Sequence, residues 1–128
     1  MKAHGAGLIT PSGESLPLSS AVELDGLVFF SGQIALKDGQ IRGDIEDQTN
    51  LVFDILEAKL SALDLSLENV AKATIWLTEA SDFARFNSVY RKRMSAPYPA
   101  RSCVLSTLML SGALIELEIV AGHTRRSV

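Results

Sequence analysis

The sequence predicts an α+β domain in which one mixed β-sheet is covered on one face by two helices. Two stretches, one following Asp44 and one following Ser81, carry apolar residues at helical spacing. The other apolar stretches alternate with a period of two, which is typical of strands. The expected order is strand-strand-strand, helix, strand, helix, strand, strand, so a single layer of helices must cover a single sheet.

The composition places the chain among ordinary globular proteins. Its 128 residues fit one domain, which at this size buries roughly two thirds of its unfolded surface. Apolar residues make up 47% and charged residues 21%. The net charge of -3 offers no broad basic surface, so we expect no nucleic-acid partner. No run of about 18 apolar residues occurs, and the start has no secretory pattern, so we also expect no membrane span.

Cys103 is the single cysteine. One cysteine excludes an internal disulfide framework and a multi-thiolate metal site, and we expect no bound metal. It also fits a reducing compartment, so we expect a cytoplasmic protein.

Three strands are predicted before the first helix. Residues 1–15 form a polar arm that should run over the surface, with a solvated His4. Residues 16–24 are extended, and Asp25-Gly26 then turns the chain into residues 27–34. Within the second strand, Gly32 is expected at a bulge or a point of close backbone approach. A second hairpin signal, Asp38-Gly39, closes the next short ribbon.

The first helix is expected to begin after an N-cap at Asp44 and to end near residues 62–64. The strand that follows, residues 71–78, alternates strictly, so Trp76 lies on the face opposite to Ile75. Another subunit would cover Trp76 most simply, although a loop or an exposed aromatic residue is equally ordinary.

The second helix is predicted from a cap at Ser81 to about Met94. An apolar stripe on this helix should face the core; it consists of Phe83, Phe86, Tyr90 and Met94. Asn87 is one position off the stripe and could face the edge of the sheet, near a ligand. The tail, residues 123–128, has no apolar pattern.

Charged residues on the last two strands suggest a site for a small acid. Alternation puts Arg101 and Cys103 on one face of the first strand, and Glu116 with Glu118 on one face of the second. Arginine offers a planar fork that binds carboxylates, and a glutamate can hold or deprotonate water. A structural salt bridge, or exposure at a sheet edge, is the simpler alternative on spacing alone. No histidine lies near Cys103 in sequence, which favours a packed, inert thiol.

Four blocks in this order resemble the reactive intermediate deaminase (RidA) family, also called YjgF. They are Ser31–Ile34, Asp82–Tyr90, Pro99–Val104 and Ile115–Ile119. The resemblance runs from Leu16 to Ala121 and includes the spacing between Cys103 and Glu116. It implies a chorismate-mutase-like α+β fold, here a single domain over residues 16–122, which assembles as a homotrimeric barrel with ligand clefts between subunits. It also implies hydrolysis of 2-imino or 2-enamino acids, such as 2-iminobutanoate and 2-iminopropanoate, to 2-keto acids and ammonia without a cofactor.

The resemblance also implies roles for individual residues. Arg101 would hold the substrate carboxylate, the main chain around Cys103 the imine or keto end, and Glu116 the attacking water. Asn87 would line the cleft, and Ser31 with Gly32 would form part of its wall.

The family pattern is broken at Leu18, where a tyrosine usually enters the cleft. Loss of its hydroxyl makes the pocket more apolar, which predicts altered substrate preference or reduced turnover, unless a neighbour such as Tyr98 takes its place. A protein that binds a small keto or amino acid without turning it over therefore stays an alternative. Endoribonuclease or translation-inhibitor activity, also attributed to the family, is a distant third because the chain lacks a basic stripe.

Overall fold

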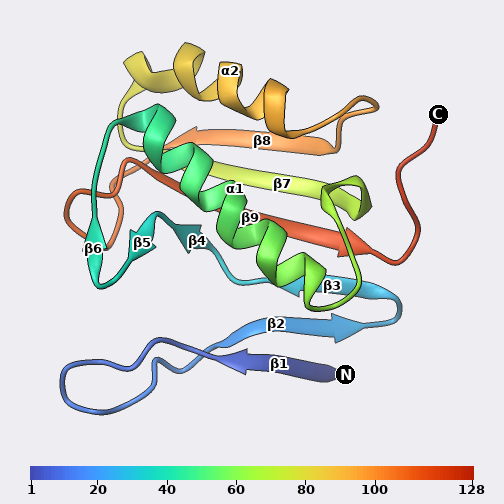
Figure 1. Ribbon diagram of the computed structural model, residues 1–128, viewed down its shortest axis with the longest axis horizontal. Coiled ribbons are helices and arrows are strands. Elements are labelled where there is room, and N and C mark those ends of the chain that lie inside the picture. Colours follow the sequence, from blue (N-terminus) through green and yellow to red (C-terminus); the bar gives the residue numbers. More distant parts are fainter.

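A computed structural model describes all residues, 1–128 (Figure 1). It confirms the predicted mixed sheet, whose strands lie in the order β1-β2-β3-β9-β7-β8, with the short β4 paired to β9. All pairs are antiparallel except β7 with β8. The strands are β1 (Lys2–Ala6), β2 (Ser19–Leu24), β3 (Leu27–Phe30), β4 (Gln33–Ile34), β7 (Val70–Leu77), β8 (Ala100–Leu105) and β9 (Ile115–Gly122). A separate ribbon consists of β5 (Leu36–Lys37) and β6 (Gln40–Ile41).

Both predicted hairpin turns are present. Asp25 and Gly26 have φ values of 50° and 79°, and Asp38 and Gly39 have φ values of 53° and 74°. Two successive residues in the left-handed region make the two-residue turn that matches the twist of paired strands. The Asp-Gly pairs therefore fix where β2 returns as β3 and where β5 returns as β6.

The first helix, α1 (Ile45–Ser61), begins as predicted. The side chain of Asp44 accepts from the N–H of Asp47 at 3.0 Å, and the side chain of Asp47 accepts from the N–H of Asp44 at 3.1 Å. This capping box satisfies donors that the first turn leaves free. Past the helix end, Asp64 takes a left-handed conformation with φ 59°.

The second helix, α2 (Phe83–Arg93), starts one residue later than predicted, because its N-cap is Asp82 and not Ser81. The predicted cap Ser81 lies instead inside a short 3₁₀ turn, Ala80–Asp82, and neither this turn nor α2 has a side-chain cap. Phe83, expected in the core, is 45% exposed because it sits on the first turn beyond the cover of α1. Phe86, Tyr90 and Met94 are buried as expected.

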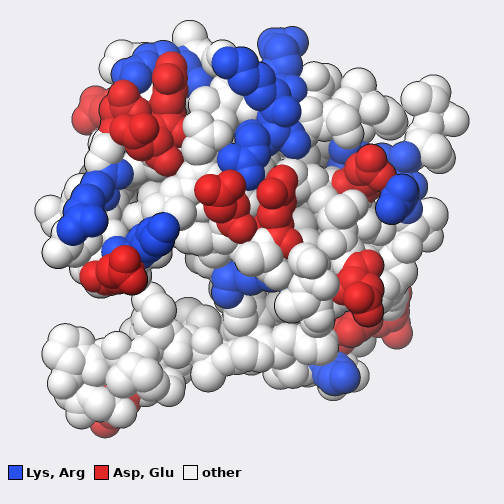
Figure 2. Space-filling view, in the orientation of Figure 1, with Lys and Arg blue, Asp and Glu red and all other residues white.

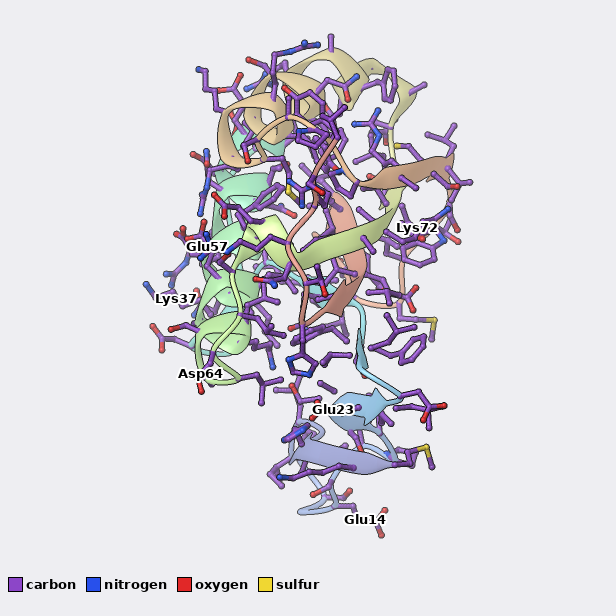
Figure 3. The ribbon with its side chains drawn as sticks, turned by 90° about the vertical axis from the view of Figure 1, so that its right-hand side faces the viewer. Glu14, Glu23, Lys37, Glu57, Asp64 and Lys72 are labelled. Carbon is purple, nitrogen blue, oxygen red and sulfur yellow. The ribbon has the colours of Figure 1, made fainter.

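The two helices cover one face of the sheet, and the core lies between them and the strands. Figure 3 shows the helices on one side of the sheet and Lys72 of β7 on the other. The largest fully buried side chains come from α1, α2, β7 and β9; they include Ile45, Phe53, Leu56, Leu60, Ile75, Phe86, Ile115, Leu117 and Ile119. No element of the chain covers the opposite face, where Trp76 is half-buried.

The N-terminal arm is partly a strand, because residues 2–6 pair with β2. His4, expected to be solvated, is half-buried and its Nε2 lies 3.3 Å from Oε2 of Glu23. His123 contacts the other oxygen of Glu23 at 2.6 Å. These two contacts lower the pKa of Glu23, the His123 contact most strongly. Sequence spacing gave no sign of this cluster, since its members are brought together by strand pairing.

The C-terminal tail is attached by one arginine. The guanidinium of Arg126 donates to the carbonyl oxygens of Leu67, Val70, Ser95 and Pro97, from the segments before β7 and before β8. Because every residue has a backbone carbonyl, the partners of Arg126 could not be identified from the sequence. The segment leading to Arg101 is thereby tied to the body of the domain.

Candidate active site

The sheet separates the two residues that the sequence suggested as a pair. Arg101 is in register with Ala73 of β7, which is buried under the helices. Glu116 is in register with Trp76, which lies on the uncovered face. Because directly paired residues point to the same side of a sheet, Arg101 and Glu116 point to opposite faces of one chain. The expected Arg101–Glu116 pairing is therefore not formed within a single copy.

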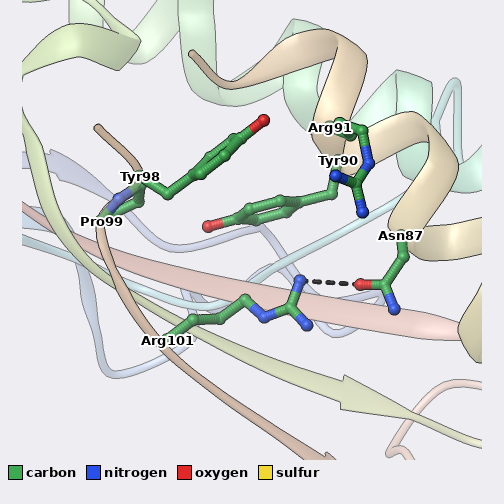
Figure 4. Close-up of a pocket in the computed structure, with 6 residues that line it drawn as sticks. All are labelled: Asn87, Tyr90, Arg91, Tyr98, Pro99 and Arg101. Atoms are coloured by element: carbon green, nitrogen blue, oxygen red, sulfur yellow. Dashed lines mark hydrogen bonds between the residues drawn. The ribbon is translucent and has the colours of Figure 1, made fainter. Parts of the chain in front are cut away.

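Arg101 lies in a hollow of about 340 Å³ between α2 and the start of β8 (Figure 4). Its Nη1 donates to Oδ1 of Asn87 at 2.8 Å, so Asn87 faces the sheet edge as predicted. The guanidinium stacks on aromatic rings, with Cζ 4.9 Å from the Tyr90 centroid and 5.6 Å from that of Phe86. It forms no salt bridge, so the structural ion pair considered above is absent, but the other alternative holds, because Arg101 is exposed on the edge strand β8. An oriented, unpaired guanidinium is suited to binding an external carboxylate.

Four further residues line this hollow: Tyr98, which the sequence suggested as a replacement for the missing cleft tyrosine, Pro99 of the Pro99–Val104 block, and Tyr90 and Arg91, to which no ligand-binding role was assigned. Arg91 follows Asn87 by four positions, which places both on one face of α2 and could have indicated it. Tyr90 was assigned to the core, and it is buried, but its hydroxyl has no hydrogen-bond partner. Burial raises the pKa of Tyr90. The hollow thus offers two guanidinium groups, and the Tyr90 hydroxyl lies buried in its wall.

Glu116 lies in a second hollow, of about 380 Å³, at the break between β3 and β4. Gly32 at this break makes the predicted close approach, because a Cβ there would lie 2.3 Å from Oε2 of Glu116. The Glu116 side chain makes no hydrogen bond to the rest of the chain. Burial, and secondly the neighbouring Glu118 carboxylate, raise the pKa of Glu116. A carboxyl group with a raised pKa can exchange protons closer to neutral pH.

The structure places the other residues named from the sequence in different surroundings. Ser31 and Leu18 line the Glu116 hollow, where the Ser31 hydroxyl donates to the carbonyl of Ser19 at 2.6 Å. Tyr98 lies in the Arg101 hollow, so within one copy it does not adjoin Leu18. Cys103 is half-buried beside Phe83, and burial raises the pKa of its thiol. A thiol with a raised pKa is a poor nucleophile at neutral pH, which agrees with the inert cysteine expected.

The structure contains no cluster of three or more histidine, cysteine or acidic residues that could hold a metal. Neither helix has the length and apolar character needed to cross a membrane. On the face that carries the helices, basic and acidic side chains are interspersed, and no basic stripe runs across it (Figure 2).

Comparison with known proteins identifies the class. The family described as Endoribonuclease L-PSP matches residues 12–123. The chain is 40% identical over 111 residues to the mitochondrial protein mmf2 of Schizosaccharomyces pombe, covering 84% of this chain and 88% of that protein. Its fold matches RidA from an Antarctic Psychrobacter with a TM-score of 0.79 and 32% identity, over 83% of this chain and 88% of the other. It also matches Escherichia coli TdcF with bound serine, with a TM-score of 0.79, 30% identity and 97% of both chains covered.

The chain therefore belongs to the YjgF/RidA family. TdcF carries the provisional name of a reactive intermediate deaminase. Since mmf2 is described as mitochondrial, the cytoplasmic location expected for this chain stays a prediction.

Proposed function

We propose that this protein hydrolyses 2-imino acids to 2-keto acids and ammonia without a cofactor. The observation that carries the proposal is the guanidinium of Arg101, which Asn87 and Tyr90 orient and which no carboxylate of the chain neutralises. Family membership, and the provisional name of TdcF, support the same reaction class.

The proposed site is shared between two copies of the chain. One copy supplies Arg101, Asn87 and the main chain near Cys103, and its neighbour supplies Glu116 with the wall formed by Leu18, Ser31 and Gly32. The support is geometric, because the two groups of residues line separate hollows, and Arg101 and Glu116 point to opposite faces of one sheet. A second copy is the simplest source of the missing half.

A closed trimer would also cover the bare face of the sheet. Apolar side chains remain partly exposed there: Val104, at 44%, is in register with the half-buried Trp76, and Phe29, at 43%, lies further along the same face. Exposed apolar groups that adjoin one another are typical of association surfaces. We therefore propose that copies of this face pack together in a barrel-like homotrimer.

The chemistry needs a carboxylate clamp, an oriented water and one proton carrier. With the substrate carboxylate on Arg101, the ionised Glu116 takes a proton from water while the oxygen attacks C2 of the imine. The carbon–nitrogen double bond becomes single as its nitrogen is protonated. Glu116 supplies that proton to the nitrogen, then takes the proton of the new hydroxyl group and passes it to the nitrogen as well, so the C–N bond breaks, ammonia leaves, the keto group forms and Glu116 is ionised again. Such base catalysis contributes roughly 10²- to 10⁴-fold, and positioning adds to it.

The test generates 2-iminopropanoate and 2-iminobutanoate with an amino-acid oxidase and traps them with semicarbazide. The wild-type chain is expected to lower trapping, whereas Arg101→Ala and Glu116→Gln should not. Arg42→Ala and Glu14→Gln, which change exposed residues outside both hollows, serve as matched controls. Normal turnover by either site variant would reject the role given to that residue.

Mixing the two inactive variants tests whether the site is shared. In mixed assemblies, Arg101 of the Glu116→Gln copy can meet Glu116 of the Arg101→Ala copy. Random mixing would then restore about a quarter of the sites. If each site lay within one copy, the refolded mixture would stay inactive.

A non-catalytic binding protein is the second candidate. It is favoured by Leu18, which supplies no hydroxyl, and by the serine found in TdcF. Calorimetric binding of a keto or amino acid, without loss of trapped imine, would select it. Ribonuclease activity, which the family description names, is disfavoured by the net charge of -3.

A further inference from the structure

The hollow beside Glu116 has a predominantly apolar wall. It opens where the β1–β2 hairpin diverges from β4, and Figure 2 shows the surface hollowed between the N-terminal hairpin and the rest of the molecule. The apolar side chains that line it include Leu8, Leu16, Leu18, Ile34, Leu36 and Leu110. Its volume of about 380 Å³ lies in the range of small-molecule sites.

This wall is held in place by the backbone of the N-terminal hairpin. The N–H of Leu16 donates to the carbonyl of Leu8 at 2.8 Å, and the N–H of Leu18 donates to the carbonyl of Leu16 at 2.7 Å. Gly7 packs directly against both leucines, since a Cβ there would lie 2.6 Å from the Leu16 carbonyl oxygen and 3.1 Å from Cγ of Leu18. The leucines are therefore fixed before any ligand enters.

The leucines of the wall keep much of their surface in water. Leu18 is 46% exposed, Leu110 is 44% exposed and Leu16 is 39% exposed. Covering this surface with an apolar group is favourable, and the gain grows with the area covered. A methyl or ethyl side chain covers less of it than a leucine-sized one.

The polar groups of the hollow act in opposite directions on a second carboxylate of a ligand. The ammonium of Lys59 donates to the uncharged hydroxyl of Ser20 at 2.6 Å and has no carboxylate partner, so it would attract such a group. Burial and Glu118 disfavour the charged form of Glu116, and another anion beside it would add like-charge repulsion. An uncharged aliphatic chain depends on neither group and gains only from the apolar wall.

We propose that this hollow is the side-chain subsite of the imine hydrolase and selects leucine-sized aliphatic 2-imino acids over those with a methyl or ethyl group. The inference rests on the proposed function, because it places the reacting carbon next to Glu116. Leu18 is the residue that determines this preference, since it occupies the wall of the hollow that also contains Glu116 and Gly32.

The test compares kcat/KM for imines generated from leucine, alanine and glutamate. The leucine-derived imine is expected to be preferred over the alanine-derived one by about tenfold or more, the discrimination that added methylenes give in an apolar pocket. Leu18→Ser should reduce this ratio severalfold without changing hydrolysis of the alanine-derived imine to the same degree. Leu24→Ser is the matched control, because Leu24 is 44% exposed but lies outside the hollow.

Calorimetry with the keto-acid products separates failure of the inference from failure of the proposed function. Hydrolysis with no preference for the larger side chain, or a preference for the glutamate-derived imine, overturns the inference and leaves the function. Absence of hydrolysis together with tighter binding of the leucine-derived keto acid than of pyruvate overturns the function and supports the subsite. If neither hydrolysis nor tighter binding of the leucine-derived keto acid is found, both the proposed function and the subsite are overturned.

Discussion

The guanidinium of Arg101 lies 4.9 Å from the centre of the Tyr90 ring, and the hydroxyl of Tyr90 is buried without a hydrogen-bond partner. Aromatic faces attract a guanidinium and limit its movement. A buried hydroxyl without a partner costs free energy in the empty site, and a ligand atom that accepts from it would recover that cost. The pair thus combines an oriented cation with a donor left for a ligand.

Replacement of Tyr90 by phenylalanine separates these two contributions. Tyr90→Phe keeps the ring under Arg101 and removes the hydroxyl, so the free energy of unfolding should stay equal or rise by up to about 1 kcal/mol. Affinity for a keto acid should fall roughly fivefold. Urea unfolding and calorimetry measure the two quantities. Unchanged affinity would mean that the ligand does not use the hydroxyl.

Asn87→Asp places a carboxylate where the amide oxygen accepts from Arg101. The new ion pair would hold Arg101 at least as firmly, but it would compete with a substrate carboxylate for the guanidinium. Keto-acid affinity should drop about tenfold or more, with no loss of thermal stability. Asn87→Ala, which frees Arg101 without adding charge, should weaken binding less. If Asn87→Ala weakened binding more than Asn87→Asp, the orientation of Arg101 would matter more than the added charge.

The raised pKa of Glu116 predicts the pH dependence of turnover. As a base, Glu116 must be ionised, so activity should fall as the pH drops through this raised pKa. Glu118→Gln removes the second cause of the shift and should move the acidic limb of the pH–rate profile to lower pH. If the acidic limb of the pH–rate profile does not move, it reports the titration of another group.

The same shift bears on stability. Because the pKa of Glu116 is higher in the folded chain than in the unfolded chain, folding takes up a proton between the two values. Stability should therefore fall as the pH rises through that window. Glu116→Gln should remove this slope in melting curves recorded across the window.

Gly32→Ala tests the close approach of backbone and carboxylate. The added Cβ would lie 2.3 Å from Oε2 of Glu116, so the carboxylate must move. Turnover should fall by at least about tenfold, since small misplacements of a reacting group are costly. Gly122→Ala is the matched control on β9, where the nearest atom to an added Cβ is 3.7 Å away. Equal effects of the two substitutions would point to general destabilisation.

Two adjacent arginines in the tail should differ sharply in their effect on stability. Arg126→Ala removes donors from four backbone carbonyls and should lower the free energy of unfolding by about 2–4 kcal/mol. Arg125→Ala removes one exposed ion pair with Glu68 and should cost less than about 1 kcal/mol. Urea unfolding of both variants makes the comparison. Similar losses would show that Arg126 does not hold the loops.

Local signals explain which parts of the fold the sequence could predict. The capping pair at Asp44 and the Asp25-Gly26 turn act within four residues, so their structures followed from pattern alone. The start of α2 was misplaced because no side chain caps it. Gly32 was expected at a bulge or a point of close backbone approach, and it lies at the break between β3 and β4, against the Glu116 carboxylate.

The arrangement of the site depends on long-range pairing, which pattern does not specify. Alternation assigned Arg101 and Glu116 each to a face of its own strand, but which faces coincide depends on both strands pairing with β7. Tyr90 and Arg126 were missed for a similar reason. Their partners are a cation on another strand and backbone carbonyls from distant loops.

Because Arg101 and Glu116 point to opposite faces, the two faces of each copy carry different halves of the proposed site. In the shared site proposed above, a copy that gives Arg101 to one neighbour gives Glu116 to a different neighbour. Two copies joined by one such contact would complete one site and leave an unused arginine and an unused glutamate. A ring leaves neither, so the count of complete sites equals the count of copies, and any break in the ring removes a site.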